Sequence, residues 1–427
     1  MRRSILLMVS ILVVLSMVLP ATVPAAEPVT IQWWHIWPNE PLIFETFQSL
    51  ADEFMAANPG VTIEITQFEN EAFKQKIATV MQSGEPPDIF QSWGGGVLGV
   101  YADAGLVQDL TPALATDGWG DSMSAGALAI FQVDGKNYSV PWRAGMFGVF
   151  YNKELFAKAG IENPPATWSE LLDDVKKLKD AGITPIALGE GDKWPGMSWY
   201  ACLLARTATP EEILGAADRT GSFDSEGFVA AGEKLADLIA LEPFQTGFLG
   251  ATYDEAEALM ANGQAAMQLM GHWGYGYSAG SLAEDPEAYN KFIGWFPFPQ
   301  VEGGNGEPTA IYGGGDSFAV GKNAPPEAIA FVRFLLSPEV HQRLVDNTAV
   351  PLPIVEGVAA NYANPLFETM AEQIGQAKFV LNYLDHQFPP PLDSAVNDEV
   401  QKLFAGTATA AQVAGALEEL AKQNLDK

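Results

Sequence analysis

Tryptophans and polar side chains stand together where the predicted strands of this chain end. Trp34 and His35 follow the first predicted strand, and Trp93 follows the third in a glycine-rich stretch. In open α/β sheets, ligands bind at the carboxyl ends of the strands, so aromatic faces there suggest a ligand with flat apolar surfaces. A pyranose ring is such a ligand, because its axial C–H faces stack on indole and its hydroxyls need carboxylate, amide or guanidinium partners. Residues of these types occupy several other predicted turns: Glu69, Asn70, Trp142, Arg143, Trp273 and Asp316.

Most of these residues also have a purely structural interpretation. Trp33 and Trp34 alternate along a strand, which places Trp33 in the core and leaves Trp34 for a site. Arg143 could equally pair with a surface acid, and the three glycines before Asp316 could form a plain turn or hinge. Trp273 is the strongest candidate, because the glycines that flank it would let the backbone approach a ligand closely. Three further residues fit either role: Trp194, Trp199 and His386.

The sequence contains no local pattern that supports catalysis. The serine-hydrolase elbow is absent, and the stretch from Gly315 to Lys322 has the wrong spacing for a phosphate loop. The four histidines are widely separated, with no i, i+4 pair, so we predict no metal site. Acid pairs such as Glu284-Asp285 do not sit at strand ends, as a glycosidase would need, and in a chain this acidic they are expected on solvated faces. We therefore expect no cofactor and no enzymatic activity.

The N-terminal part of the chain alternates strand and helix patterns. Residues 29–34 and 61–65 read as strands, and apolar spacing predicts helices over 44–54 and 70–82. A third strand opens at residues 88–90. This βαβαβ order predicts an α/β fold with a mostly parallel sheet that helices cover on both faces.

Further elements follow along the rest of the chain. Residues 138–141 and 148–151 read as two strands around a turn at 142–145, and residues 183–188 read as another strand. A capping box at Thr167 and Glu170 predicts the start of a helix. Other helical patterns cover 228–240, 254–262, 326–336, a segment beginning at Ser337-Pro338, and roughly the last 25 residues.

Length and charge restrict the class of protein. The chain has 427 residues, which predicts two or three domains. It carries 53 acidic and 23 basic residues, for a net charge of −30. Such a field repels phosphate backbones and anionic lipid, so we expect no nucleic-acid partner and no membrane-surface binding.

The N-terminal sequence has the pattern of a secretory signal. Arg2 and Arg3 precede an apolar run over 5–19, and small residues lead up to Ala26. We therefore predict that residues 1–26 are a cleaved signal peptide. The single Cys202 can form no intramolecular disulfide, and no cysteine lies in the stretch before Glu27 to carry a lipid anchor. We expect a freely diffusing protein in the periplasm or outside the cell.

Several motifs together resemble one known family, the extracellular solute-binding proteins of ABC sugar importers, which are maltose-binding-like proteins. In chain order they are Gly84-Glu85-Pro86-Pro87-Asp88-Ile89, Ala104-Gly105-Leu106-Val107-Gln108-Asp109-Leu110-Thr111, Asp134-Gly135-Lys136-Asn137-Tyr138-Ser139-Val140-Pro141, Tyr151-Asn152-Lys153-Glu154-Leu155-Phe156, Pro165-Ala166-Thr167-Trp168-Ser169-Glu170-Leu171 and Asn262-Gly263-Gln264-Ala265-Ala266-Met267. The resemblance spans the chain that follows the predicted signal.

The resemblance implies a two-lobed periplasmic-binding-protein fold of type II, with the ligand cleft between the lobes. One lobe would comprise residues 27–140 plus 310–345, and the other residues 141–309 plus 346–427. The turns that contact ligand in the family map onto the candidates above and add three residues: Ser92, Gly94 and Gly315. The lobes would close about a hinge without making or breaking a bond.

The resemblance also implies partners. These are a small-molecule sugar and the transmembrane permease subunits of an ABC transporter, served by a monomeric receptor. Three segments are most similar to receptors for xylobiose and related β-linked disaccharides: Trp33-Trp34-His35-Ile36, Glu69-Asn70-Glu71-Ala72-Phe73-Lys74 and Phe90-Gln91-Ser92-Trp93-Gly94-Gly95-Gly96. The alternatives are a receptor for a non-sugar solute and an exported glycosidase.

Overall fold

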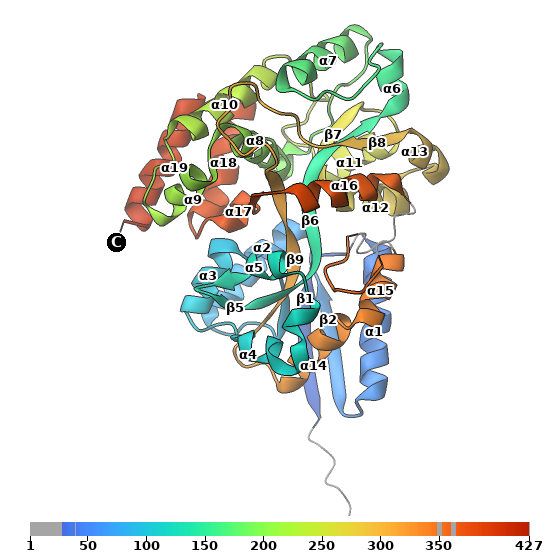
Figure 1. Cartoon of the computed structure of the whole chain (residues 1–427), viewed down its shortest axis with the longest axis vertical. Helices are drawn as coiled ribbons and strands as arrows, with labels where there is room; N and C mark the ends of the chain where they lie inside the picture. The colour runs from blue at the N-terminus through green and yellow to red at the C-terminus, as the bar shows by residue number, and fades with distance from the viewer. Residues whose placement is uncertain (1–27, 39, 348–351, 360–363, 427) are drawn as a thin grey trace, which may run out of the picture.

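The computed structural model describes residues 28–38, 40–347, 352–359 and 364–426, and these form two lobes, one above the other in Figure 1. Strands β6 (Ser139–Asn152) and β9 (Ile311–Val320) run side by side between the lobes. This is the two-lobed α/β architecture that the resemblance implied. The predicted signal peptide, residues 1–26, lies outside the described residues.

The first lobe is built on the predicted βαβαβ unit. Strand β1 (Val29–His35) pairs in parallel with β2 (Val61–Gln67) and with β3 (Ile89–Ser92). Helices α1 (Pro41–Ala57) and α2 (Asn70–Ser83) make the two connections, so the predicted order is confirmed.

Strand β9 completes the sheet of the first lobe from much later in the chain. It runs antiparallel to β3 on one side and to β6 on the other, giving the order β2-β1-β3-β9-β6-β7. The first half of β6 pairs with β9, and its second half pairs with β7 (Met267–Gly271) and β8 (Ile293–Phe296). Strand β6 therefore belongs to both lobes.

The prediction of two short strands around a turn at 142–145 is wrong, because β6 is one continuous strand. It is almost entirely buried, so it lacks the apolar and polar alternation that marks a half-exposed strand. The glycines before Asp316 are likewise not a turn. A Cβ on Gly313 or Gly315 would run into the backbone of β6, so glycine lets the two strands lie against each other there.

Helix α8 (Trp194–Thr207) forms the centre of the second lobe and is buried along nearly its whole length. Helices α10 (Glu226–Ile239) and α18 (Leu392–Phe404) pack against it. Residues 183–188 do not form the predicted strand. They make only single bridges, from Ile186 to Phe244 and to Met267, because the chain passes the sheet edge at one residue.

The helix starts expected from capping patterns are present. The Thr167 and Glu170 side chains cap α7 (Trp168–Asp180) reciprocally, as predicted. The remaining elements of the first lobe are α3 (Gly95–Asp103), α4 (Thr111–Leu114), α5 (Ala125–Ala129), β4 (Gln132–Val133), β5 (Lys136–Asn137), α14 (Pro326–Leu335) and α15 (Pro338–Asp346). Those of the second are α6 (Lys153–Lys158), α9 (Pro210–Asp218), α11 (Tyr253–Ala261), α12 (Trp273–Tyr277), α13 (Pro286–Phe292), α16 (Pro365–Gln376), β10 (Val380–Leu381), α17 (Leu384–Gln387) and α19 (Ala410–Asn424).

Residues 352–359 lie against the first lobe, although the sequence assigned 346–427 to the second. The Ser124 N–H donates to the Ile354 carbonyl at 2.8 Å, and the Glu356 N–H donates to the Ser122 carbonyl at 2.8 Å. These backbone bonds hold the segment there, and the chain enters the second lobe with α16. The rest of the predicted division between the lobes stays a prediction.

Each lobe has its own hydrophobic core. Trp33 is fully buried among Phe47, Phe318 and Phe331 in the first lobe, which confirms its predicted core role. The core of the second lobe surrounds α8. Within the described residues, no helix combines the length and apolar character needed to cross a membrane.

Candidate ligand-binding site

A cavity of about 390 Å³ lies between the two lobes, and segments far apart in the sequence line it. The loop after β1, the start of α2 and the turn after β3 contribute from the first lobe. The starts of α8, α11 and α12 contribute from the second, and the two shared strands and α17 complete the wall. The main lining residues are Trp37, Glu40, Glu69, Asn70, Lys74, Trp93, Arg143, Asp192, Trp194, Tyr253, Asp254, Trp273, Tyr277, Tyr312, Asp316, Tyr383, Asp385 and His386.

Trp273 is held rigidly at the cavity wall. It begins α12 directly after β7, and its ring stands edge-on to Phe147 with centroids 5.3 Å apart. The indole lies over Gly271, where any Cβ would collide with the ring. The sequence predicts that the flanking glycines let a ligand approach the backbone. Gly271 instead makes room for the tryptophan itself.

Arg143 on β6 and Asp316 on β9 form a buried ion pair across the two shared strands. The side-chain amide of Gln91 donates to the other Asp316 oxygen at 2.5 Å. The Arg143 guanidinium also lies over the Trp142 ring, with its carbon 4.6 Å from the ring centroid. Burial disfavours the charged guanidinium, but Asp316 and then Glu40 outweigh this effect and raise the pKa of Arg143. The pair is therefore charged and fixed in place at the cavity wall.

A second ion pair joins the two lobes directly. Lys74 of α2 contacts Asp385 of α17 at 2.9 Å and Glu71 at 2.8 Å. Burial would raise the pKa of Asp385, but Lys74 and then His386 lower it to about 2. Beside this pair, the His386 imidazole stacks on the Trp93 indole with centroids 4.4 Å apart. One face of Trp93 is therefore covered by protein.

Two carboxylates are tied to the backbone at the cavity. Glu69 caps α2 by accepting from the N–H groups of Glu71 and Ala72 at 2.9 and 3.1 Å. Asp192 accepts from the N–H of Tyr253 at 2.6 Å, across from the first lobe. Both carboxylates keep acceptor capacity for ligand hydroxyls, because a carboxylate has about four lone-pair sites.

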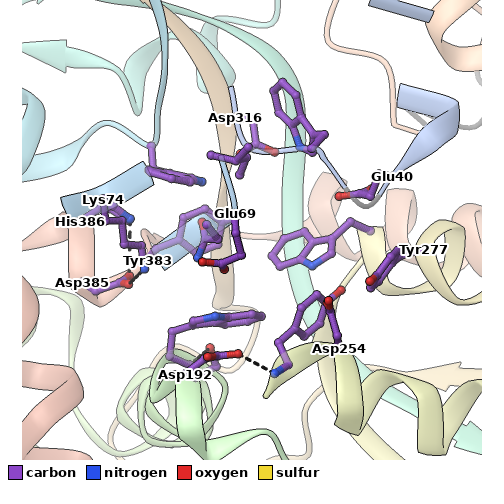
Figure 2. Close-up of a pocket in the computed structure, with 18 of the residues that line it drawn as sticks. Glu40, Glu69, Lys74, Asp192, Asp254, Tyr277, Asp316, Tyr383, Asp385 and His386 are labelled. Carbon is purple, nitrogen blue, oxygen red and sulfur yellow. Dashed lines mark hydrogen bonds and ion pairs between the residues drawn. The ribbon is translucent and has the colours of Figure 1, made fainter. Parts of the chain in front are cut away.

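Glu40 stands at the opposite end of the cavity from the Lys74 and Asp385 pair. Figure 2 shows Glu40, Tyr277 and Asp254 on one side, and Lys74, Asp385 and His386 on the other. Burial raises the pKa of Glu40 to about 7, with a partial opposing effect of Arg143. One end of the cavity therefore has an acidic side chain without a cation of its own, and the other end has the Lys74 and Asp385 ion pair.

The structure brings six of the twelve predicted site residues to the cavity. They come from both lobes and from the two shared strands: Glu69, Asn70, Trp93, Arg143, Trp273 and Asp316. Their contact with a ligand stays a prediction. Of the three residues that fitted either a site role or a core role, Trp194 and His386 line the cavity. Trp199 is fully buried in α8.

The other six predicted residues do not line the cavity. His35 and Trp142 are fully buried, since both pack into the aromatic core around Phe47. Trp34 rests on Phe68, with ring centroids 5.0 Å apart. The remaining three serve the backbone. The Ser92 hydroxyl accepts a hydrogen bond from the Gly94 N–H, and Gly94 has a φ of 75° that favours glycine. Gly315 lies against the backbone of Arg143.

Several lining residues escaped prediction from the sequence. Tyr253 and Asp254 directly follow Thr252, whose capping box with Glu255 marks a helix start that could have been read. Tyr383 and Asp385 lie in a segment without regular periodicity, so no sequence pattern placed them at the site. Within the described part of the chain, no group of three or more His, Cys, Asp or Glu side chains is arranged to hold a metal ion.

A cavity between two lobes, with aromatic walls and a few buried polar groups, defines the site of a small-molecule receptor. The model of the bacterial extracellular solute-binding protein family matches residues 37–342. The chain belongs to this family, and the resemblance seen in its sequence motifs is confirmed.

Relatives and solved structures agree with this assignment. An uncharacterized ABC transporter extracellular-binding protein of Pyrococcus horikoshii is 29% identical over 57% of this chain, and the match spans 55% of that relative. A structure from work on xylan utilization by the thermophilic bacterium Caldanaerobius polysaccharolyticus has a TM-score of 0.83 at 28% identity, covering 92% of this chain and all of that one. A chitin oligosaccharide binding protein has a TM-score of 0.86 at 27% identity, covering 93% and 99%.

Proposed function

We propose that this chain is the substrate-binding component of an ABC sugar importer and that it captures an oligosaccharide, such as xylobiose or a related β-linked disaccharide. The observation that carries the proposal is the cavity between the lobes, in which Trp273, Trp194 and Tyr253 stand among carboxylates and Arg143. Indole and phenol rings can stack on the C–H faces of a pyranose, while charged groups bind its hydroxyls strongly. The chain is similar to a structure from work on xylan utilization and to a chitin oligosaccharide binding protein, and this similarity supports a β-linked ligand.

The size of the cavity supports a ligand of a few sugar rings. Its volume of about 390 Å³ falls in the lower part of the range for small-molecule sites, roughly 300 to 1,000 Å³. An anionic solute fits the cavity poorly, because both lining cations, Lys74 and Arg143, already have carboxylate partners.

The mechanism we propose is hinge closure followed by delivery. The two lobes move about β6 and β9, and ligand contacts from both lobes favour the closed state. The closed receptor then docks on the permease, and no covalent step takes place. The chain acts as a monomer in the periplasm or outside the cell after removal of residues 1–26.

A thermal-shift panel tests this function. Protein beginning at Glu27 is melted with xylobiose, cellobiose, maltose and their monosaccharides, because a ligand that binds only the folded state raises the melting temperature. We expect xylobiose or another β-linked disaccharide to give the largest shift. A flat panel would contradict sugar binding, and release of phenol from an aryl xyloside would contradict a purely binding role.

A further inference from the structure

The cavity lining carries more negative than positive charge. Among the described lining residues, two are cationic, Lys74 and Arg143, and both are already neutralised by carboxylates. The lining carboxylates outnumber them three to one: Glu40, Glu69, Asp192, Asp254, Asp316 and Asp385. Asp316 and Asp385 are buried, Glu40, Asp192 and Asp254 are half-buried, and Glu69 is exposed. Most of the surplus is therefore only partly solvated, and charge interactions there are stronger than in bulk water.

Among the lining carboxylates, the negative charge of Glu40 is the least balanced by nearby positive charge. Within the described residues, no hydrogen bond or ion pair reaches its carboxylate, which faces the cavity beside Trp273. Arg143 on β6 attracts it, but this guanidinium is already held by Asp316 on β9. On the opposite lobe, Asp254 faces it from α11 and Tyr277 from α12. Glu40 therefore faces two carboxylates, Asp316 on β9 and Asp254 on α11, and its attraction to Arg143 is shared with Asp316.

The hydrogen-bonding chemistry of this end favours a ligand that donates. Ionised carboxylates only accept hydrogen bonds, and a sugar hydroxyl offers one hydrogen, whereas an ammonium offers three together with a positive charge. Hydrogen bonds between an ammonium and a carboxylate are roughly twice as strong as neutral ones. An ammonium bound at Glu40 would offset part of the surplus charge at this end of the cavity.

We infer that this cleft prefers a glycoside that carries a free ammonium group, an amino sugar, over its neutral counterpart, with the ammonium bound at Glu40. The inference rests on the proposed sugar-binding function and names the substrate class of the same site. The aromatic rings hold the sugar faces, and the acidic end selects the charge.

A comparison of matched disaccharides tests the inference. Titration calorimetry at neutral pH measures β-1,4-linked diglucosamine against cellobiose, which differs only in having a hydroxyl at each amine position. We expect diglucosamine to bind at least about tenfold more tightly. Xylobiose and a linear diamine serve as ligands that lack the amine and the ring, respectively.

Two variants locate the effect. Glu40→Gln keeps the size of the side chain and removes its charge, so we expect it to lose most of the preference for diglucosamine while cellobiose affinity changes much less. Glu162→Gln is the matched control, because Glu162 is exposed and lies away from the cavity. Far-UV circular dichroism and the melting temperature show that both variants are folded.

The outcomes separate this inference from the proposed function. Equal or weaker binding of diglucosamine than of cellobiose, or a preference that Glu40→Gln leaves intact, overturns the amino-sugar inference and leaves sugar binding standing. Binding of the diamine with no binding of any disaccharide overturns both.

Discussion

Removing one partner of the Arg143 and Asp316 pair should destabilise the ligand-free protein strongly. Asp316→Asn keeps the shape of the side chain and the bond from Gln91 but leaves the guanidinium, 4% exposed, without its counter-charge. Breaking a buried ion pair in this way costs roughly 3–5 kcal/mol. Glu40 also attracts Arg143, so we expect a value of about 3 kcal/mol, in the lower part of that range.

The magnitude converts into a measurable shift of the melting temperature. Unfolding entropy near 60 °C is about 2.1 cal/mol/K per residue, or roughly 0.8 kcal/mol/K for the ~400 residues that follow the predicted signal peptide. A loss of about 3 kcal/mol then lowers the melting temperature by about 4 °C. Differential scanning calorimetry without sugar measures this shift free of any effect on ligand binding.

A double-mutant cycle distinguishes the ion pair from simple loss of packing. Arg143→Met alone should cost about as much as Asp316→Asn, because it leaves a buried carboxylate with only Gln91 as partner. The double variant has no buried charge at this position and should be much more stable than the sum of the single effects predicts. Strictly additive effects, or an Asp316→Asn variant that melts with the wild type, would refute the reasoning.

Three further predictions concern binding, pH and backbone packing. Trp273→Ala should weaken the affinity for the sugar found in the thermal-shift panel by about 1–3 kcal/mol, measured by calorimetry, and an unchanged affinity would remove Trp273 from the site. Burial raises the pKa of Glu190 to about 9, so the folded protein holds a proton that the unfolded chain releases near pH 4.5. Stability should therefore fall as pH rises from about 5 to 9, and Glu190→Gln should flatten this slope in urea titrations. Gly313→Ala should cost at least about 1–3 kcal/mol, because the new methyl meets the backbone of β6, whereas Gly375→Ala on the exposed face of α16 should be neutral or slightly stabilising; equal melting temperatures would contradict the packing argument.

The sequence predicted the elements whose patterns are local. Helix α2 and the β1 to β3 unit were correct, because half-buried elements repeat apolar residues at the period of a helix or strand. Strand β6 was divided wrongly, because burial on both faces removes that period. The turn chemistry expected around Arg143 was therefore also wrong, although the residue itself faces the cavity.

The candidate site was predictable in part, from residues whose chemistry suits a ligand and which lie at strand ends or in predicted turns. Trp93 was found after a predicted strand and Trp273 through its flanking glycines, whereas Tyr383 and Asp385 reach the cavity from a segment near the end of the chain. No local rule connects such a segment to a cavity, because only the tertiary fold places it there. For the same reason, His35 and Trp142 had the right chemistry but pack in the core.

The central position of β9 bears on how the chain acquires its structure during synthesis. β9 lies between β3 and β6 in the sheet, with Ile89 paired to Val320, so the sheet of the first lobe stays incomplete until most of the chain has been made. Contacts between such distant residues form slowly, because the intervening chain must first be ordered. A newly made chain therefore cannot complete this sheet before residue 320 has been synthesised. The export that we propose for this chain would need it unfolded until then, and a central strand made this late would serve that need.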